Sequence, residues 1–262
     1  MIVKDYQAYF VDLDGTIYRG KERIPAAARF VKRVRKAGKK LIFVTNNSTR
    51  TPEDVVKKLR IQHQIEASPD DVYTSAIAAA DYLKSHLAGK GQKRVYAIGE
   101  NGLKMALQKR GFILTDHHPD FVTVGLDFDV TYHKFEVATL AIRNGARFIG
   151  TNGDTNLPSE RGMIPSAGSL VKLVEYATQQ KPIMIGKPEK LMMEMALQRY
   201  GLRKEDVLMV GDNYHTDIMA GINEQMDTLL VFTGLTQPEE LSTFCEQPTY
   251  TAYSLDEWTI NN

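Results

Sequence analysis

Short apolar segments alternate with segments of helical periodicity along the whole chain of 262 residues. The apolar segments cover residues 9–13, 41–45, 95–98, 121–126, 147–150, 183–185, 207–210 and 228–232. Most of them are apolar at every position, which is typical of strands that are covered on both faces of a parallel sheet. Strands that alternate with helices build right-handed βαβ units. The sequence therefore predicts an α/β fold.

The segments between these strands carry helix signals. The segments 25–37 and 188–200 each open with a proline, carry apolar residues at helical spacing and are followed by a glycine. Thr51 and Pro52 are typical of a helix cap and a first-turn proline, and two acidic residues follow them. These signals predict one helix after each of three predicted strands, namely 9–13, 41–45 and 183–185.

The composition is that of an ordinary globular protein. There are 33 Lys and Arg residues against 32 Asp and Glu residues, so the formal net charge is +1. This balance gives no electrostatic preference for nucleic acid or for an anionic membrane surface, and no apolar run approaches the roughly 20 residues of a membrane span. The single cysteine, Cys245, excludes an intramolecular disulfide, and we expect it to be a packing residue. We expect a cytoplasmic protein that binds neither nucleic acid nor membranes.

The domain organisation allows two interpretations. Residues 75–180 contain enough strands and helices for a small α/β unit, and the segments before and after them supply strands with polar, Asp-rich ends. One interpretation is a core sheet interrupted by an inserted domain. The other is a single continuous sheet.

Polar residues follow four of the predicted strands at the point where each strand ends. The four segments are Asp12-Leu13-Asp14-Gly15-Thr16, Thr45-Asn46-Asn47-Ser48, Gly186-Lys187-Pro188, and Gly211-Asp212 with Asp217 five residues further on. In α/β sheets, functional residues gather just beyond the carboxyl ends of the strands. We therefore expect the four segments to form one site.

The residue types in these segments suit metal-assisted phosphoryl transfer. Asp12 and Asp14 are two residues apart, so in an extended chain both can point to the same side. Together with Asp212 they would repel one another, and a site of oxygen ligands alone favours Mg²⁺ as the balancing cation. One carboxylate can then attack phosphorus, while another protonates the leaving oxygen and later activates water.

Further groups complete the expected site. Thr45 and backbone N–H groups near Asp14 and Asn46 can bind phosphoryl oxygens, and Lys187 can balance their negative charge. Gly15 permits a tight turn that brings the backbone close to the phosphate. Each segment alone is also explained as a turn, a helix cap or a solvated lysine. The combination of all four, in one order at strand ends, favours a functional site.

This set of motifs resembles the haloacid dehalogenase-like superfamily of phosphatases. Its order and spacing look like the NagD-like branch, in which a large cap is inserted between the second and third motifs, and the stretches 124–127, 150–156 and 168–170 support that branch. The resemblance covers essentially the whole chain. It implies a doubly wound, Rossmann-like parallel-sheet core formed by residues 1–75 and 181–262, with an inserted smaller α/β cap at residues 76–180.

The resemblance also implies a role for each motif residue. Asp12 would be the nucleophile that forms an aspartyl-phosphate, and Asp14 would be the general acid and base. The groups that bind or stabilise the phosphoryl group would be Gly15, Thr45, Asn46, Asn47 and Lys187. The ligands of Mg²⁺ would be Asp12, the backbone carbonyl of Asp14 and Asp212, and Asp217 would be a ligand through water or would orient the other ligands. Because an alkoxide leaving group needs a proton, the carboxylate of Asp14 favours a phosphatase over a dehalogenase.

The implied cap would close over the phosphate site and select the leaving group. Asp127, Asn152, Asp154 and Thr155 are the candidates that would line its cavity, although the segment 152–156 is also typical of a turn-rich loop. We expect small phosphomonoesters as substrates: sugar phosphates, nucleoside monophosphates or aryl phosphates. The resemblance is compatible with a homodimer.

Two alternative functions use the same residues. A phosphotransferase or phosphomutase would pass the phosphoryl group to a sugar hydroxyl, and it would yield an isomerised product rather than free phosphate. A non-catalytic protein that binds a phosphorylated ligand would bind tightly without releasing phosphate. The intact set of Asp12, Asp14, Lys187 and Asp212 favours hydrolysis.

Overall fold

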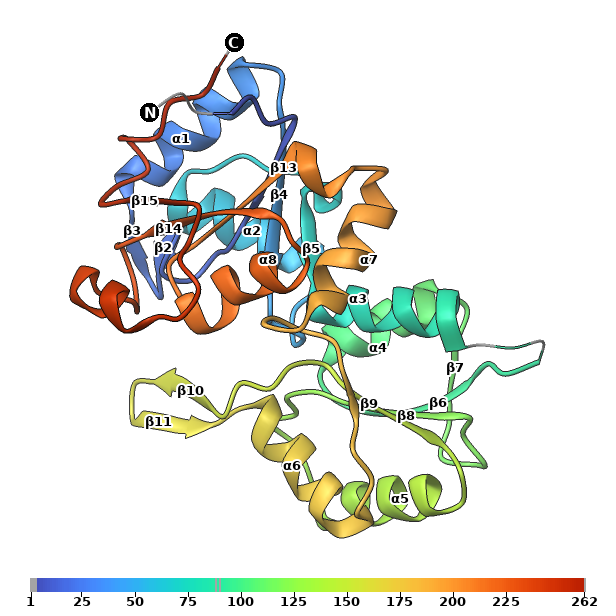
Figure 1. Ribbon diagram of the computed structural model, residues 1–262. Helices are drawn as coiled ribbons and strands as arrows, with labels where there is room; N and C mark the ends of the chain where they lie inside the picture. Colours follow the sequence, from blue (N-terminus) through green and yellow to red (C-terminus); the bar gives the residue numbers. More distant parts are fainter. Residues whose placement is uncertain (1–3, 88, 90, 262) are drawn as a thin grey trace. The chain divides into compact units, whose positions relative to one another are not determined.

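The computed structural model describes residues 4–87, 89 and 91–261 (Figure 1). The chain divides into two compact units. Unit 1 comprises Met1–Thr45, Pro52–Tyr73 and Lys187–Asn262, and unit 2 comprises Asn46–Thr51 and Thr74–Gly186. The short segment 46–51 therefore belongs to unit 2, although unit 1 precedes and follows it in the sequence. The assignment of one unit as a catalytic core and the other as a cap stays a prediction.

Unit 1 contains a six-stranded sheet in the order β15-β14-β13-β1-β4-β5. Its strands are β1 (Ala8–Val11), β4 (Lys40–Thr45), β5 (Val72–Thr74), β13 (Val207–Gly211), β14 (Asp227–Val231) and β15 (Tyr250–Ala252). β1 pairs in parallel with β4 and with β13, and Val11 lies level with Phe43 on one side and Val210 on the other. The residues that follow these three strands therefore share one edge of the sheet.

Helices cover both faces of the unit 1 sheet. They are α1 (Pro25–Lys36), α2 (Pro52–His63), α7 (Lys190–Tyr200) and α8 (Met219–Asn223). Successive strand residues point to opposite faces. Val11 packs in one apolar cluster with α1 and α2, through side chains such as Phe30, whereas Phe10 contacts Tyr200 of α7 with ring centroids 6.4 Å apart. The predicted doubly wound α/β core is confirmed.

Helix α1 begins and ends where the local signals predict. In α1, Pro25 occupies the first turn, and the chain turns at Gly38, whose φ of +69° lies in the left-handed region. Phe30 and Val34 lie on its buried face. Full burial of a side chain of this size contributes about 1.5–3 kcal/mol, so the packed face stabilises this helix more than helix propensity does.

Unit 2 contains a five-stranded parallel sheet in the order β12-β9-β8-β6-β7. Its strands are β6 (Arg94–Ile98), β7 (Ile113–Leu114), β8 (Phe121–Val124), β9 (Arg147–Gly150) and β12 (Ile183–Met184). Its helices are α3 (Ser75–Tyr82), α4 (Asn101–Lys109), α5 (Tyr132–Arg143) and α6 (Ala167–Thr178). The strand order reverses at β6, and in α/β sheets such a reversal opens a crevice beyond the carboxyl ends of the strands.

Smaller elements complete the two units. Antiparallel hairpins join β2 (Tyr18–Arg19) to β3 (Glu22–Arg23) and β10 (Asn156–Ser159) to β11 (Gly162–Pro165). Short 3₁₀ or π segments lie at Pro69–Asp71, Leu83–Leu87, Lys204–Asp206, Tyr214–Ile218 and Pro238–Thr243. Within the described ranges, no helix combines the length and the apolar character that a membrane crossing requires.

Three details of the sequence prediction were wrong. The helix expected from residue 188 begins at Lys190, because Pro188 precedes the extended residue at its cap. The segment 183–185 forms β12 in the unit 2 sheet, beside β9, and not a strand of the sheet that carries Asp12. Cys245, expected to be a packing residue, is exposed. In each case the local sequence does not specify the neighbour that decides the outcome.

A buried histidine attaches the β2–β3 hairpin to α2. The His63 ring stacks on Tyr18 with centroids 4.3 Å apart, and Nζ of Lys58 lies 3.8 Å from the centre of the Tyr18 ring. Neither ring nitrogen of His63 has a hydrogen-bond partner. Burial, assisted by the charges of Lys58 and Arg23, lowers the pKa of His63. The imidazole is therefore neutral in the folded protein at neutral pH.

We expect this histidine to make the folded protein less stable as the pH falls from 7 to 5. The unfolded chain binds a proton at His63 near the ordinary pKa of about 6.5, whereas the folded chain binds it only at lower pH. The free energy of unfolding therefore decreases on acidification, by at most about 1.4 kcal/mol per pH unit from this group. Denaturant unfolding at a series of pH values measures the slope.

The matched variants are His63→Phe and His117→Gln. His63→Phe keeps an aromatic ring against Tyr18 and removes the titrating group, so its free energy of unfolding, relative to that of the unmodified protein, should increase as the pH falls from 7 to 5. The side chain of His117 is 91% exposed, and His117→Gln should leave the profile unchanged. An identical slope in His63→Phe and the unmodified protein would contradict the prediction.

Candidate active site

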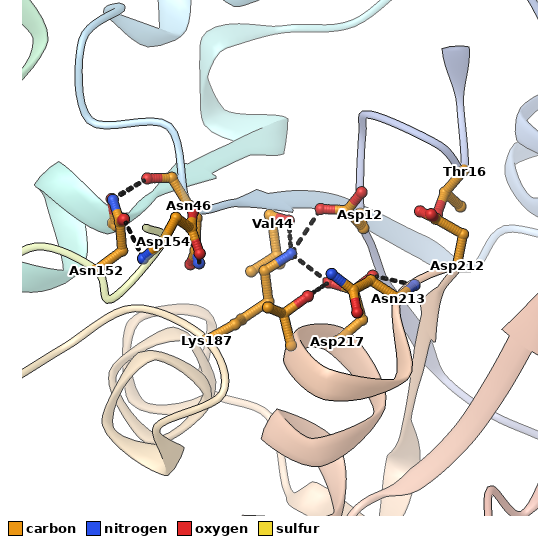
Figure 2. Close-up of polar contacts among 12 residues, drawn as sticks. Asp12, Thr16, Val44, Asn46, Asn152, Asp154, Lys187, Asp212, Asn213 and Asp217 are labelled. Atoms are coloured by element: carbon orange, nitrogen blue, oxygen red, sulfur yellow. Dashed lines mark hydrogen bonds and ion pairs between the residues drawn. The ribbon is translucent and has the colours of Figure 1, made fainter. Parts of the chain in front are cut away.

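Three carboxylates meet at the carboxyl edge of the unit 1 sheet (Figure 2). Asp12 follows β1, Asp212 follows β13, and Asp217 lies in the helical segment Tyr214–Ile218. One oxygen atom of each carboxylate lies within 4.8 Å of the others. The adjacent parallel strands bring Asp12 and Asp212 together because both strands end at the same level. The structure thus gathers the side chains of three of the four predicted metal ligands.

Backbone and hydroxyl donors fix the Asp212 carboxylate. Thr16 Oγ1 donates to Oδ1 and the Leu235 N–H donates to Oδ2, each at 2.9 Å. Two glycines make room for it: a Cβ atom at Gly15 would lie 2.2 Å from Oδ2, and one at Gly234 would lie 1.9 Å away. Gly15 also has a φ of +101°, a conformation that a residue with a side chain rarely adopts. The Asp212 side chain therefore has a single, preformed position.

Lys187 joins two of the carboxylates. Its ammonium Nζ donates to Asp12 Oδ1 at 2.5 Å and to Asp217 Oδ1 at 2.7 Å, and it also donates to the carbonyl oxygen of Val44 at 3.1 Å. Only 2% of the Lys187 side chain is exposed. Val44 lies in β4, beside the end of β1, so the ammonium spans two adjacent strand ends. Figure 2 shows these three contacts as dashed lines.

Burial and mutual repulsion set the ionisation of the cluster. Burial raises the pKa of Asp12, the charge of Asp217 adds to this, and Lys187 partly offsets it. Burial and Asp217 likewise raise the pKa of Asp212 to about 6, against the opposing effect of its hydrogen-bond donors. For Lys187, burial lowers the pKa, but the carboxylates of Asp12 and Asp217 outweigh it and raise the pKa above its usual value. The ammonium of Lys187 alone therefore does not neutralise the three carboxylates.

The donor set fits a hard divalent cation. Three ionised carboxylates and one ammonium leave two negative charges in a space that water scarcely reaches. A divalent cation balances these two charges, and a site of oxygen ligands alone suits Mg²⁺ better than Zn²⁺. The side chains of Asp12, Asp212 and Asp217 can hold such an ion.

The remaining predicted residues of unit 1 lie in the same turn or at the next strand end. Asp14 is exposed, and its Oδ1 accepts a hydrogen bond from the Gly20 N–H at 3.0 Å. The Gly15 N–H donates to the carbonyl oxygen of Tyr18 at 2.6 Å, which closes the turn after β1. Thr45 is the last residue of β4 and is buried. Asp14 is therefore open to solvent, two residues after the buried Asp12.

The predicted residues of unit 2 have structural contacts of their own. Nδ2 of Asn46 donates to the carboxylate of Asp154, and Nδ2 of Asn152 donates to the Asn46 carbonyl oxygen. Oδ1 of Asn47 accepts hydrogen bonds from the backbone N–H groups of Thr49 and of residue 50, at 2.9 and 3.2 Å. The Asn47 side chain therefore closes a turn, which is the simpler of the two roles open to it from the sequence.

Two further predicted residues of unit 2 also contact their neighbours. Asp127 is buried and forms an ion pair with Lys134 at 2.8 Å, and it accepts a hydrogen bond from the Asp129 N–H at 2.9 Å. Thr155 is exposed and donates to Oδ1 of Asn156 at 3.1 Å. Their predicted role in lining a substrate cavity stays a prediction.

Sequence reasoning missed several groups around the carboxylates. Thr16 was part of the first motif without a role of its own, and the loop after β14, with Gly234 and Leu235, was not considered. Asp212 accepts the Leu235 N–H, and a backbone donor has no sequence signature. Gly234, which follows the apolar strand β14, was a sequence signal that could have pointed to this loop. A glycine is needed there because the Asp212 carboxylate occupies the space that a side chain would fill.

Comparisons with known proteins agree with this geometry. A family model described as haloacid dehalogenase-like hydrolase matches residues 9–113, and a second model, described as HAD-hydrolase-like, matches residues 184–258. Together they include the segments that carry Asp12, Lys187 and Asp212.

Whole-length relatives extend the match. The 5'-nucleotidase YutF of Bacillus subtilis is 46% identical over 98% of both chains, and an acid sugar phosphatase of Staphylococcus aureus is 46% identical over 97% of both. Among solved structures, a thermostable NPPase from Geobacillus stearothermophilus has a TM-score of 0.90 at 47% identity, covering 98% of this chain and 99% of its own. NagD from E. coli K-12 has a TM-score of 0.91 at 31% identity with the same coverage. The chain belongs to the haloacid dehalogenase-like hydrolases, in the NagD-like branch that its motifs predict.

Proposed function

We propose that this protein is a Mg²⁺-dependent phosphatase that hydrolyses small phosphomonoesters through an aspartyl-phosphate on Asp12. The contact of Asp12 with Lys187, beside Asp212 and Asp217, carries the proposal. The contact supports the proposal because an ammonium beside a carboxylate nucleophile can also stabilise the phosphoryl group that the nucleophile accepts. The relatives named as a 5'-nucleotidase, an acid sugar phosphatase and a p-nitrophenylphosphatase support nucleoside monophosphates, sugar phosphates and aryl phosphates as substrates.

The reaction proceeds in two displacements at phosphorus. An oxygen of Asp12 attacks phosphorus, the bond to the leaving oxygen breaks, and Asp14 donates its proton to that oxygen. Asp14 then accepts a proton from water, which attacks phosphorus and breaks the bond to Asp12. Inorganic phosphate leaves, and both carboxyl groups return to their starting states. The exposure of Asp14 suits this exchange of protons with the leaving group and with water.

Other residues bind the phosphoryl oxygens. Lys187 stabilises the negative charge on the Asp12 carboxylate and on the phosphate. Thr45 and Asn46 bind the phosphoryl group. Two turns, one at Gly15 and the other at Asn47, bring backbone N–H groups to it. The side chains of Asp12, Asp212 and Asp217, together with the backbone carbonyl of Asp14, would hold Mg²⁺. When bound, the cation supplies positive charge that stabilises the phosphoryl oxygens.

The two units have different roles in this proposal. Unit 1, which corresponds to the predicted core of residues 1–75 and 181–262, carries the chemistry. Unit 2, which corresponds to the predicted cap of residues 76–180, selects the leaving group, and Asp127 and Thr155 are its candidate substrate contacts. A homodimer and a cytoplasmic location remain part of the proposal. The proposed binding partners are its substrates, small phosphorylated metabolites.

Phosphate release from a panel of phosphomonoesters tests the proposal. The panel contains a nucleoside monophosphate, a sugar phosphate and p-nitrophenyl phosphate, each with Mg²⁺ and with a chelator. We expect metal-dependent release and a loss of about 10³-fold or more in kcat for Asp12→Asn, because the nucleophile is removed. The exposed Asp70→Asn is the control and should retain full activity. Isomerised product without free phosphate would instead indicate a phosphomutase, and binding without turnover would indicate a non-catalytic protein.

Asp14→Asn tests the second carboxylate. Nitrophenolate leaves without a proton, so the variant should still form the aspartyl-phosphate from p-nitrophenyl phosphate but hydrolyse it slowly. We expect a burst of about one nitrophenol per active site, followed by turnover reduced by about 10²–10⁴-fold. Stopped-flow absorbance measures both phases. Unreduced turnover in Asp14→Asn would contradict its role as the general acid and base.

Asp212→Asn tests the cation site. The raised pKa of Asp212, about 6, means that the metal-free folded protein holds more protons than the unfolded chain between about pH 4 and 6. The metal-free protein therefore loses stability as the pH rises through this range. At pH 7.5 the metal-free variant should be more stable than the metal-free parent, on the order of 2 kcal/mol. Thermal unfolding with a chelator and with Mg²⁺ measures this, and Mg²⁺ should stabilise only the parent. Equal stabilisation of both by Mg²⁺ would contradict the assignment.

A further inference from the structure

The segment 46–51 fills the carboxyl edge of the unit 2 sheet. The Gly102 N–H, at the start of α4 after β6, donates to the carbonyl oxygen of Thr49 at 2.9 Å. Thr151 Oγ1, after β9, donates to Ser48 Oγ at 3.4 Å. This edge is where α/β sheets commonly bind a ligand. In unit 2 that place is taken by the chain's own phosphoryl-binding segment.

The fit between this segment and the sheet edge is close. A Cβ atom at Gly102 would lie 2.5 Å from the carbonyl oxygen of Arg50, and one at Gly186 would lie 2.7 Å from Oδ1 of Asn46. Real Cβ atoms do not approach other atoms so closely. A side chain at Gly102 would therefore displace the backbone of the segment, and one at Gly186 would displace the Asn46 side chain or the carbonyl oxygen of Thr151. The close packing explains why the segment 46–51 belongs to unit 2.

Three side chains of unit 2 hold Asn46 itself, and Figure 2 shows two of them, Asn152 and Asp154. Its Nδ2 donates to the two carboxylate oxygens of Asp154, at 3.1 and 3.3 Å. Its carbonyl oxygen accepts from Ser75 Oγ at 2.6 Å and from Asn152 Nδ2 at 2.9 Å. Asn152 is 3% exposed, and its Oδ1 accepts the Asp154 N–H at 3.1 Å. Asp154 and Asn152 thus form one unit that contacts Asn46 at both its side chain and its backbone.

These contacts set the direction of the next N–H group. A peptide group is planar, and in the trans form its N–H points opposite to its C=O. Two donors on the Asn46 carbonyl oxygen fix the plane of the peptide between Asn46 and Asn47. The direction of the Asn47 N–H is therefore determined by Ser75 and Asn152, more than 25 residues away in the sequence.

We propose that Asp154 and Asn152 are positioning residues, which orient Asn46 for phosphoryl binding and do not contact the substrate. The proposal rests on the function assigned to Asn46 above. It replaces the substrate contact that the sequence suggested for Asn152 and Asp154. A carboxylate repels a phosphate dianion, so Asp154 is poorly suited to bind the substrate. As the acceptor for the amide of Asn46, it fixes a neutral donor group in place.

A double-mutant cycle tests this role. The cycle contains Asp154→Ala, Asn46→Ala and the double variant, and Asp154→Asn serves as the conservative variant that keeps an acceptor oxygen. We expect Asp154→Ala to weaken inhibition by inorganic phosphate about tenfold. It should lower kcat/KM by the same factor for p-nitrophenyl phosphate and for a sugar phosphate. The double variant should be no worse than Asn46→Ala, and Asp154→Asn should restore most of the activity.

Other outcomes would overturn the proposal. A loss in the double variant equal to the product of the two single losses would show that Asp154 acts independently of Asn46. A loss confined to one leaving group would show a direct substrate contact. The exposed Asp116→Ala, in the same unit, is the matched control and should leave all constants unchanged. Thermal unfolding of each variant identifies any loss of folding.

Amide hydrogen exchange separates this proposal from the function it rests on. In the substrate-free protein, Asp154→Ala should speed exchange of the amides in the segment 46–50, while Asp116→Ala and Asp154→Asn should not. If Asp154→Ala exchanges faster but the parent protein releases no phosphate, the proposed phosphatase is refuted and the contact between Asp154 and Asn46 stands. Unchanged exchange and unchanged phosphate inhibition in an active protein would refute the positioning role alone.

Discussion

The ammonium of Lys187 between Asp12 and Asp217 is the interaction on which the site depends. It partly balances three carboxylates gathered at one strand edge, and it is itself almost fully buried. Removing one partner of such a buried pair costs about 3–5 kcal/mol, because the other charge is left uncompensated. The donors of Thr16 and Leu235 on Asp212 serve the same end. Each of these polar contacts holds a charge that water no longer solvates.

The chain passes from one unit to the other at residues with proposed roles. Thr45 ends a strand of unit 1 and Asn46 is the first residue held by unit 2; Gly186 ends unit 2 and Lys187 begins the return to unit 1. Residues with proposed roles therefore stand at both passages. At each passage, a residue of unit 1 (Thr45 or Lys187) is bonded directly to a residue of unit 2 (Asn46 or Gly186). In the proposed function, hydrogen bonds within unit 2 therefore hold Asn46, a residue proposed to bind the phosphoryl group.

The sequence predicted those parts of the site that depend on local order along a strand. Asp12 and Asp212 could be placed because a polar residue after a continuously apolar strand has a defined edge to occupy. Lys187 was predicted to lie at the site because the strand before it was expected in the same sheet as Asp12. That strand pairs instead with β9 in unit 2, so the prediction was correct but its reason was wrong. Strands β5 and β15 have three residues each and were not predicted, because so short a run has no recognisable period. The Leu235 N–H lay beyond prediction because every residue except proline has one.

The hydrogen bonds of Asn152 and Asp154 show a different limit of prediction from sequence. Asn, Asp and Thr after a strand have the same donors and acceptors whether they bind a substrate or hold another segment of the chain. The choice depends on what the fold brings to the sheet edge, and here that is a segment over 100 residues away in sequence. Because segment 46–51 occupies that edge, polar residues there are already engaged in hydrogen bonds within the protein. A polar residue after a strand is therefore assigned to a substrate or to the fold only once the segment that packs against that strand end is known.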